Sequence, residues 1–357
     1  MIGSTEYASA SCQREYRIPE ITMASEINRV PKSILIVSPS WLGDAIIALP
    51  ALEKIKSEHP ATELSILTKP QLQEFWRLTK IAGRIEIQSG GARGTWRTAL
   101  RLRSLKIDRC YIIPNSFRSA AIPWLARIPE RIGFRGHFRS ALLSEIRGAN
   151  LPPDLHQSCE VMTLVTNVAV QELEIREPLI EIDNSVAAAA KKKFKLDDGV
   201  VAIFPGAARG PSKCWPEQRY CELGMTIALR GRSIVVLGSQ AERGLCERIA
   251  ASIGPRARNL AGLTGLSELA AVLKNCAAVV ANDSGGMHLA AAVGVPVVAV
   301  YGITDSSKTG PLGIESHVLQ NSDIRARDIP RDSRIARKCL ESIAVESVYR
   351  ALDPYLN

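Results

Sequence analysis

The sequence is poor in aromatic residues, which make up 5% of its 357 residues. That share argues against a surface that stacks the bases of single-stranded nucleic acid. No basic helix with interleaved aromatic residues and no zinc-finger spacing is evident, so no nucleic-acid partner is expected. The formal net charge of +9 then favours an anionic membrane surface or a phosphorylated ligand.

The eight cysteines are scattered, and no two of them have the CxxC spacing. Neither a metal site nor a disulfide framework is indicated, and we expect reduced, mostly buried thiols in a cytoplasmic protein. No apolar run is long enough to cross a membrane. Residues 1–29 lack the basic-then-apolar order of a signal peptide, and we expect a mobile N-terminal extension over residues 1–31.

Several ligand-binding fingerprints are also missing. The turn over residues 38–44 has one glycine and does not form the GxGxxG pattern, which counts against a nicotinamide- or flavin-dependent oxidoreductase. The loop over residues 205–213 lacks the P-loop spacing. No DxD pair of carboxylates follows a strand, so the sequence implies neither a metal nor another cofactor.

The most informative pattern lies over residues 277–302, where two apolar runs flank a polar turn and an Ala-rich segment. This order predicts strand, turn, short helix and strand. Asp283 and Ser284 can cap the helix, while Gly285 lets a ligand approach the backbone closely. The amide groups at the helix N-terminus suit a phosphate. The alternative is a plain capping turn with Asp283 as the N-cap.

A similar unit opens the folded chain. A buried strand is predicted over residues 33–37, followed by the turn over 38–44, a helix over 45–57 and a second strand over 64–67. Asp44 stands at the N-terminal end of that helix. Its carboxylate either interacts with the helix dipole or faces a cleft at the strand end.

Arginines gather around two turns later in the first half. A strand over residues 109–114 ends in a turn with Asn115, Ser116 and Arg118, and a second turn carries Arg135. Arg131, Arg139 and Arg147 lie nearby. The cluster is either a solvated basic face or a site for a polyanionic acceptor, because guanidinium groups match phosphate and carboxylate oxygens.

The second half repeats the alternation of strands and helices. A strand over residues 199–204 is followed by a loop with Gly206, Ala207 and Lys213, and a strand over 233–237 leads to Glu242. Lys213 is either solvated or faces a bound anion. Two such series predict an α/β fold of two Rossmann-like, doubly wound domains facing across a cleft, with residues 32–184 in the first and 185–357 in the second.

Three motifs taken together resemble glycosyltransferase family 9, the ADP-heptose:lipopolysaccharide heptosyltransferases of the GT-B fold. They are residues 40–44, Pro205-Gly206-Ala207 with residues 213–216, and residues 282–285 with His288. Residues 113–119 and 132–136 are similar to pieces typical of the heptosyltransferase II branch. The resemblance covers roughly residues 33–352. Residues 323–338 depart from the pattern, because they lack the paired cysteines and histidine of many type II members.

The resemblance implies a metal-independent, inverting transfer of heptose from ADP-heptose to the lipopolysaccharide inner core. Asp44 matches the general base, and Lys213 matches the lysine facing the donor diphosphate. The second domain is expected to bind the donor, and the first domain is expected to bind the acceptor. Peripheral contact of the protein with the inner membrane surface is compatible with such an acceptor. The donor residues are Gly206, Ala207, Glu242, Asp283, Ser284, Gly285 and His288, and the acceptor residues are Asn115, Ser116, Arg118 and Arg135.

Other functions remain open at this point. One is another GT-B glycosyltransferase that uses a nucleotide sugar to build a cell-surface polysaccharide. A second is a two-lobed binding protein without catalysis, which would have no use for Asp44 together with Lys213. A third is the oxidoreductase that the missing glycine fingerprint disfavours. Incubation with ADP-heptose and a heptose-deficient lipopolysaccharide would separate them.

Overall fold

The computed structural model describes residues 30–136, 138–173, 175–208, 210, 213–313, 315–325, 328, 330 and 333–356. The predicted N-terminal extension, residues 1–31, therefore lies outside the described residues except for Val30 and Pro31. The predicted boundary between residues 184 and 185 stays a prediction.

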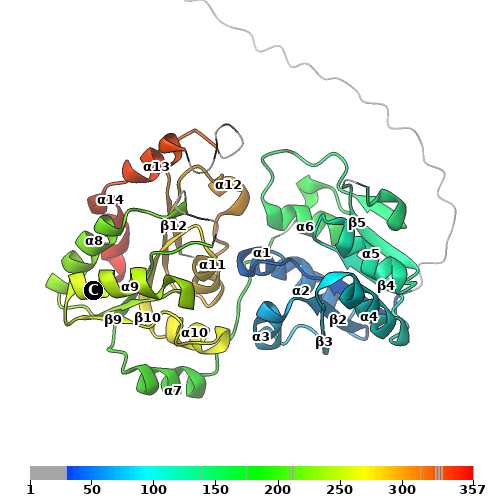
Figure 1. Cartoon of the computed structure of the whole chain (residues 1–357), viewed down its shortest axis with the longest axis horizontal. Coiled ribbons are helices and arrows are strands. Elements are labelled where there is room, and N and C mark those ends of the chain that lie inside the picture. The colour runs from blue at the N-terminus through cyan, green and yellow to red at the C-terminus, as the bar shows by residue number, and fades with distance from the viewer. Residues whose placement is uncertain are drawn as a thin grey trace, which may run out of the picture. The chain divides into compact units, whose positions relative to one another are not determined.

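The first half of the chain forms a six-stranded parallel sheet with the order β3-β2-β1-β4-β5-β6 (Figure 1). Its central strand, β1, is buried over nearly its whole length, because helices cover both faces. The strands are β1 (Ser33–Val37), β2 (Glu63–Thr68), β3 (Arg84–Ile87), β4 (Arg109–Ile112), β5 (Glu130–Phe134) and β6 (Glu145–Arg147).

Alternate side chains of β1 contact different helix layers. Ile34 and Ile36 pack with residues of α1, α2, α3 and α6, whereas Leu35 and Val37 pack with residues of α4 and α5. The helices are α1 (Leu42–Ile47), α2 (Leu49–Glu58), α3 (Gln73–Leu78), α4 (Gly91–Ser104), α5 (Phe117–Leu125) and α6 (Gln157–Thr166). The helix expected over residues 45–57, with a bend at Pro50, is present as two helices: it begins earlier, at Leu42, and is interrupted at Ala48, because Pro50 suits a helix start.

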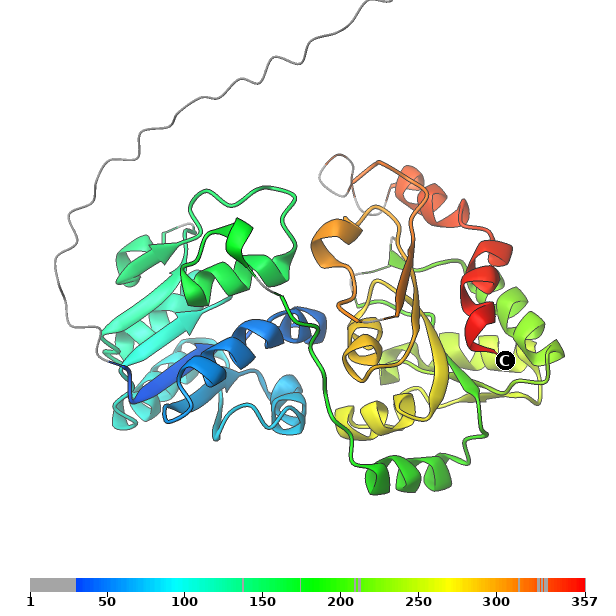
Figure 2. The same ribbon diagram turned by 180° about the vertical axis from the view of Figure 1, so that it is seen from behind.

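The second half forms another six-stranded parallel sheet, with the order β12-β11-β10-β7-β8-β9 (Figure 2). Counted from its own first strand, this is the same order as in the first sheet, and both match the Rossmann pattern. The strands are β7 (Val200–Phe204), β8 (Ile234–Val236), β9 (Ala257–Asn259), β10 (Cys276–Asn282), β11 (Val297–Val300) and β12 (Ser316–Leu319). The predicted α/β class with two doubly wound sheets is confirmed.

Helices cover both faces of the second sheet as well. Val201 and Ile203 of β7 pack with α8, α9 and the C-terminal helices, whereas Val200 and Ala202 pack with α10 and α11. The helices are α7 (Asn184–Phe194), α8 (Glu217–Leu229), α9 (Arg243–Ile253), α10 (Leu266–Leu273), α11 (Gly285–Ala292), α12 (Ser306–Thr309), α13 (Arg334–Glu341) and α14 (Val345–Leu352). Of the helices that the structure describes, none combines the length and the apolar character needed to span a bilayer.

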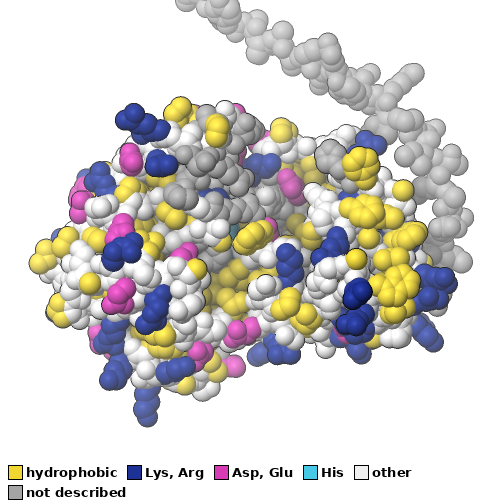
Figure 3. All heavy atoms as spheres, in the orientation of Figure 1, with side chains coloured by type: hydrophobic (Ala, Val, Ile, Leu, Met, Phe, Trp, Pro, Cys, Tyr) yellow, Lys and Arg dark blue, Asp and Glu magenta, His cyan; other side chains and the backbone are white. Residues whose placement is uncertain are grey.

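The outer surface of α4 corrects one expectation from the sequence. This helix carries four arginines, Arg93, Arg97, Arg101 and Arg103, around an exposed Trp96. A basic helix with an aromatic residue is therefore present, although none was expected. Figure 3 shows hydrophobic side chains bordered by Lys and Arg over α4 and the neighbouring α5.

Candidate functional site

The N-terminal ends of α1 and α11, one from each half of the chain, pack against each other (Figures 1 and 2). A Cβ atom added to Gly43 would lie 2.7 Å from Cδ2 of His288. A Cβ atom added to Gly285 would lie 3.0 Å from the Cβ of Leu42. Glycine at these positions lets the two helix starts approach more closely than larger residues would.

A cavity of about 230 Å³ opens beside this contact and is lined by both halves. Asp44 comes from α1, whereas Lys213 comes from the loop after β7 and Asp283 from the end of β10. The predicted residues among its walls are Asp44, Lys213, Asp283, Ser284, Gly285 and His288. The structure thus brings together the two expected catalytic residues and the turn expected to bind the donor.

Lys213 and Asp283 form an ion pair inside the cavity. Their side chains are only 13% and 9% exposed, so neither charge is well solvated. Removing one partner would leave the other charge largely buried and uncompensated, which costs several kcal/mol. The structure therefore argues against a merely solvated Lys213.

His288 is a neutral imidazole at ordinary pH. Burial lowers its pKa to about 4, an effect that the Asp283 carboxylate opposes and that His156 and Lys213 reinforce. The Nδ1 atom of His288 is buried and has no hydrogen-bond partner among the described residues. A neutral ring in this position can exchange a hydrogen bond with a ligand without adding charge.

Ser284 is the N-cap of α11, and not Asp283 as the plain-turn alternative supposed. Its hydroxyl accepts from the backbone N–H of Met287 at 3.4 Å. The Asp283 carboxylate is thereby left for Lys213. The start of α11 still presents amide groups and the positive end of its dipole to the cavity.

Asn282 is a structural residue of the site that belongs to the motif over residues 282–285 but was given no role from the sequence. It is fully buried, and its side-chain oxygen accepts from the backbone N–H of Trp215 and the hydroxyl of Tyr220, each at 2.9 Å. Its amide nitrogen donates to the Pro205 carbonyl at 2.7 Å. These bonds fix the loop after β7 against the end of β10. The available signal was an amide side chain at the last position of a buried strand.

Other wall residues were not predicted, namely Trp41, Leu42, Gly43, Ile47, Gln157, Ala208, Thr304 and Thr309. Gln157 begins α6, and Thr304 and Thr309 follow β11. Trp41, Leu42 and Gly43 belong to the motif over residues 40–44, although only Asp44 of that motif was given a role. Gln157, Thr304 and Thr309 come from strand-to-helix connections that carry no sequence motif, so only the fold could show that they share this cavity.

Gly206 and Glu242 lie next to each other. Neither of them lines the cavity, and Ala207 does not line it either. A Cβ atom on Gly206 would lie 2.0 Å from Oε1 of Glu242. The Glu242 carboxylate accepts hydrogen bonds from the N–H and the hydroxyl of Ser239, each at 2.7 Å. Arg209, Pro211 and Ser212 of the same loop lie outside the described residues.

The predicted acceptor residues do not line the cavity either. Asn115 and Arg135 are exposed, and Ser116 caps α5 by accepting from the Ser119 N–H at 3.2 Å. Arg118 donates to the carbonyls of Ser89 at 2.6 Å and Gly91 at 3.2 Å. Arg118 therefore ties the start of α5 to the start of α4, and its expected contact with the acceptor stays a prediction.

The remaining arginines of the cluster hold backbone segments together. Arg139 is fully buried, donates to the Pro114 carbonyl, and has its pKa lowered by burial. Arg131 donates to the Leu142 carbonyl at 2.7 Å, and Arg147 donates to the Leu164 carbonyl at 2.9 Å. A solvated basic face does not describe these three side chains.

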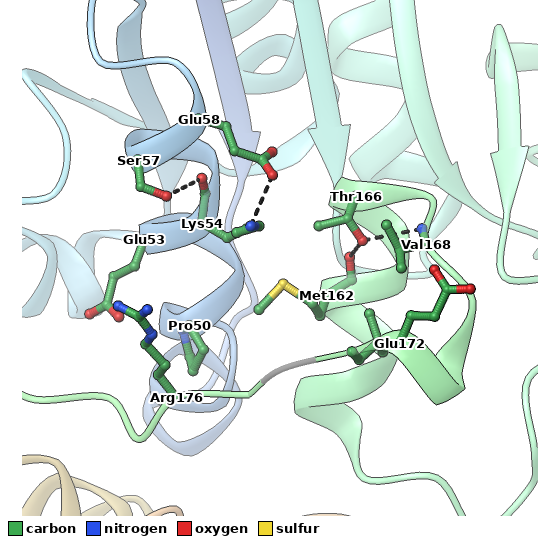
Figure 4. A pocket seen from close by; sticks show the side chains of 11 residues that line it. Pro50, Glu53, Lys54, Ser57, Glu58, Met162, Thr166, Val168, Glu172 and Arg176 are labelled. Atoms are coloured by element: carbon green, nitrogen blue, oxygen red, sulfur yellow. Dashed lines mark hydrogen bonds and ion pairs between the residues drawn. The ribbon is translucent and has the colours of Figure 1, made fainter.

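A second hollow, of about 440 Å³, lies between α2 and α6 and holds none of the predicted residues (Figure 4). Burial raises the pKa of Glu53, and Arg176, which points toward it, opposes that shift. Lys54 and Glu58 form an ion pair at 3.1 Å across one turn of α2. Their opposite charges compensate each other locally, and nothing there resembles a catalytic arrangement. No metal-binding group of three or more His, Cys, Asp or Glu occurs among the described residues.

The chain is similar to known glycosyltransferases. A family model described as glycosyltransferase family 9 (heptosyltransferase) matches residues 95–335. The chain is 30% identical to lipooligosaccharide heptosyltransferase 2 of Haemophilus influenzae, over 81% of this chain and 88% of the relative. It is 30% identical to lipopolysaccharide heptosyltransferase 2 of Salmonella typhimurium, over 80% and 87%. The solved structure of E. coli ADP-heptose lps heptosyltransferase II superposes with a TM-score of 0.81 at 26% identity, covering 91% of this chain and 98% of that one.

Proposed function

Because the chain belongs to glycosyltransferase family 9, the heptosyltransferases, we propose that it transfers a heptose from ADP-heptose to the inner core of lipopolysaccharide. The sugar that accepts the heptose is a heptose or Kdo of that core. The observation that carries the proposal is the cavity in which Asp44 lies with Lys213 and Asp283. A binding protein without catalysis would not need the Asp44 carboxylate in the same cavity as a buried lysine.

The donor is proposed to bind to the second half, residues 185–357. Its diphosphate would meet the N-terminus of α11 at Ser284 and Gly285 and would compete with Asp283 for the ammonium group of Lys213. Glu242, beside Gly206, would reach the ribose. Helix amides and one lysine supply positive charge where the leaving group becomes negative, so no metal is required.

The proposed chemistry is an in-line displacement at the anomeric carbon. The acceptor oxygen forms a bond to this carbon as the bond to the diphosphate oxygen breaks, and the configuration inverts. The Asp44 carboxylate takes the proton of the acceptor hydroxyl, while ADP leaves toward Lys213. His288 stays neutral because its pKa is about 4, and it adds no charge that would compete for the diphosphate.

The acceptor is proposed to bind to the first half, residues 32–184, where Asn115, Ser116, Arg118 and Arg135 surround neighbouring turns. A Cβ atom on Gly136 would lie 3.2 Å from the Asn115 carbonyl oxygen, so the turns at 115 and 135 adjoin. Lipopolysaccharide inner core carries anionic groups that suit arginine. Because such an acceptor is lipid-anchored, the chain is also proposed to contact the cytoplasmic surface of the inner membrane.

The test is an assay of the purified chain with ADP-heptose and heptose-deficient lipopolysaccharide. We expect equimolar release of ADP and a gain of one heptose in the mass of the acceptor. ADP-glucose and UDP-glucose serve as matched donor controls and should give little product. Efficient transfer from another nucleotide sugar, or ADP binding with no transfer to any core acceptor, would overturn the proposal.

A further inference from the structure

The surface formed by α4 and α5 exposes an unusual set of apolar side chains. Trp96 and Leu100 of α4 are 55% and 49% exposed, and Phe117 and Trp124 of α5 are 54% and 48% exposed. They are not scattered, since the two helices pack against each other and Trp96 and Trp124 line one groove of about 520 Å³. We call this surface the α4–α5 face; it consists of these four residues and the arginines described next.

Positive charge surrounds the apolar residues. Arg93, Arg97 and Arg103 of α4 are exposed, and Arg127 follows α5 at the edge of the groove. Neither helix contains an acidic residue. The acidic side chains on the neighbouring strands are paired: Glu86 with Arg101 and Glu130 with Arg109, both at 2.5 Å. Figure 3 shows the resulting mixture of hydrophobic and basic side chains over these helices.

The exposed side chains of this face do not contribute to the core of the first half. The opposite side of α4 already supplies the core contacts, through buried Gly94, Thr98, Ala99 and Leu102. A solvent-facing helix surface normally carries polar residues, and a contiguous apolar patch bordered by charge marks an interaction site. Tryptophan beside arginine is typical of segments that lie at a membrane–water interface.

The position of the face connects it to the acceptor. Both helices begin at the carboxyl edge of the first sheet, and Arg118 joins their first turns through the carbonyls of Ser89 and Gly91. Phe117 directly follows Ser116, one of the proposed acceptor residues. The groove of Trp96 and Trp124 lies toward the C-terminal ends of the two helices, whereas Phe117 lies at the start of α5. A lipid surface along the whole face would therefore extend from this groove to the edge where a lipid-anchored acceptor is expected.

We propose that the α4–α5 face docks on an anionic phospholipid bilayer, with Trp96 and Trp124 at the interface and the arginines among the lipid phosphates. The proposal rests on the function proposed above, which supplies the lipid-anchored acceptor. Each arginine near an anionic surface contributes about 1 kcal/mol, and the aromatic rings add their interfacial burial. A second copy of the chain fits poorly, because a symmetric contact would place arginines against arginines.

The test measures co-sedimentation with two kinds of vesicle, phosphatidylethanolamine with phosphatidylglycerol, and phosphatidylcholine alone. The wild-type chain should co-sediment with the anionic vesicles at low salt and should be released from them at high salt. The double variant Trp96→Ala, Trp124→Ala should bind at least about tenfold more weakly. Leu229→Ala, which removes an exposed apolar side chain of α8 in the second half, is the matched control and should bind as the wild type does.

Two further readouts keep the result interpretable. The double variant should retain the ADP affinity of the wild type and its turnover on a soluble, delipidated core acceptor, which shows that it folds. A second variant, Arg93→Gln with Arg97→Gln, should lose mainly the preference for anionic vesicles. Wild-type vesicle binding by the tryptophan variant would overturn the proposal. Binding of a single-stranded RNA oligomer in place of vesicles, or a dimer abolished by the same variant, would also overturn it.

The outcomes separate this proposal from the proposed function. Heptose transfer together with vesicle binding that ignores Trp96 and Trp124 would contradict the docking face alone. Vesicle binding that depends on both tryptophans, in a chain that transfers no heptose, would contradict the proposed function alone.

Discussion

The two halves of the molecule share one strand order but use the same connection differently. In the first half, β4 leads to α5 with Ser116 as N-cap; in the second, β10 leads to α11 with Ser284 as N-cap. Each serine accepts from the backbone N–H three residues later. Yet α5 exposes Phe117 and Trp124, whereas α11 is buried from Met287 to Ala292.

The difference shows how one topology supports two kinds of surface. In the second half the small residues of α11 allow α1 to pack against its N-terminus, and the cavity forms there. In the first half the equivalent helix is longer and apolar on its outside, and its start lies beside the arginine turns. Donor binding is proposed at the buried start of α11, and acceptor and membrane contacts are proposed at the exposed α5.

The largest expected effect concerns the carboxylate that the first half contributes to the cavity. Asp44→Asn should lower turnover by about 10²-fold or more, the usual scale for loss of a general base. Single-turnover transfer with saturating donor and acceptor measures it. Asp108→Asn is the matched control, because that carboxylate only accepts from the backbone N–H groups of Lys32 and Ser33 and lies outside the cavity. Near-normal transfer by Asp44→Asn would remove the first half from catalysis.

The buried His288 of α11 predicts that the stability of the fold depends on pH. His288 has a pKa of about 4 in the folded chain against an ordinary value of 6.5, so the unfolded chain binds more protons between these values. The free energy of unfolding should fall by up to about 3 kcal/mol as the pH drops from 6.5 to 4. Denaturant titrations across this window measure the slope. His288→Asn should flatten it, and an unchanged slope would mean that other groups cause the acid sensitivity.

The close approach of the helix starts is tested by a pair of glycine variants. Gly43→Ala should lower the free energy of unfolding by about 1–3 kcal/mol, because the new methyl group would meet His288 at 2.7 Å. Gly83→Ala meets nothing within 4 Å and should be neutral or stabilising by up to about 1 kcal/mol. Thermal unfolding compares them. Equal stability of the two variants would show that α1 and α11 are not in contact.

The exposed turn at Arg135, beside the start of α5, predicts a smaller effect, on the KM for the acceptor. Arg135→Ala should raise the acceptor KM several-fold at low salt, and the difference should shrink as salt is added. Arg135 is a cleaner probe than Arg118, whose guanidinium also holds α4 and α5 together. Arg77→Ala, an exposed arginine on α3, is the control. An unchanged KM would place the acceptor away from this turn.

The sequence predicted the central strands well. The expected strands over residues 33–37 and 199–204 match β1 and β7 to within one residue, because buried strands have clear apolar patterns. It missed β3 and α5. The strand β3 lies at a sheet edge and is only half-buried, and α5 contains Pro123, which disguises a helix.

The site was predicted by its turns but not by its contacts. Asp44, Lys213 and Asp283 follow strands, and parallel strands gather their carboxyl ends at one edge. The ion pair of Lys213 with Asp283 and the contact of Gly43 with His288 join residues far apart in the chain. The ion pair depends on the pairing of β7 with β10 within the second half, and the Gly43–His288 contact depends on the packing of the two halves. No local pattern encodes either.

The proposal that the second half binds the donor while the first half supplies the general base is tested most directly by ADP titration of two variants in a calorimeter. Asp44→Asn should bind ADP with wild-type affinity, because the first half supplies only the base. Lys213→Ala should bind about tenfold more weakly or worse, because the ammonium group facing the diphosphate is gone. Lys191→Ala, at an exposed ion pair with Asp198, controls for a general loss of positive charge. Full ADP affinity in Lys213→Ala together with weakened affinity in Asp44→Asn would contradict the account.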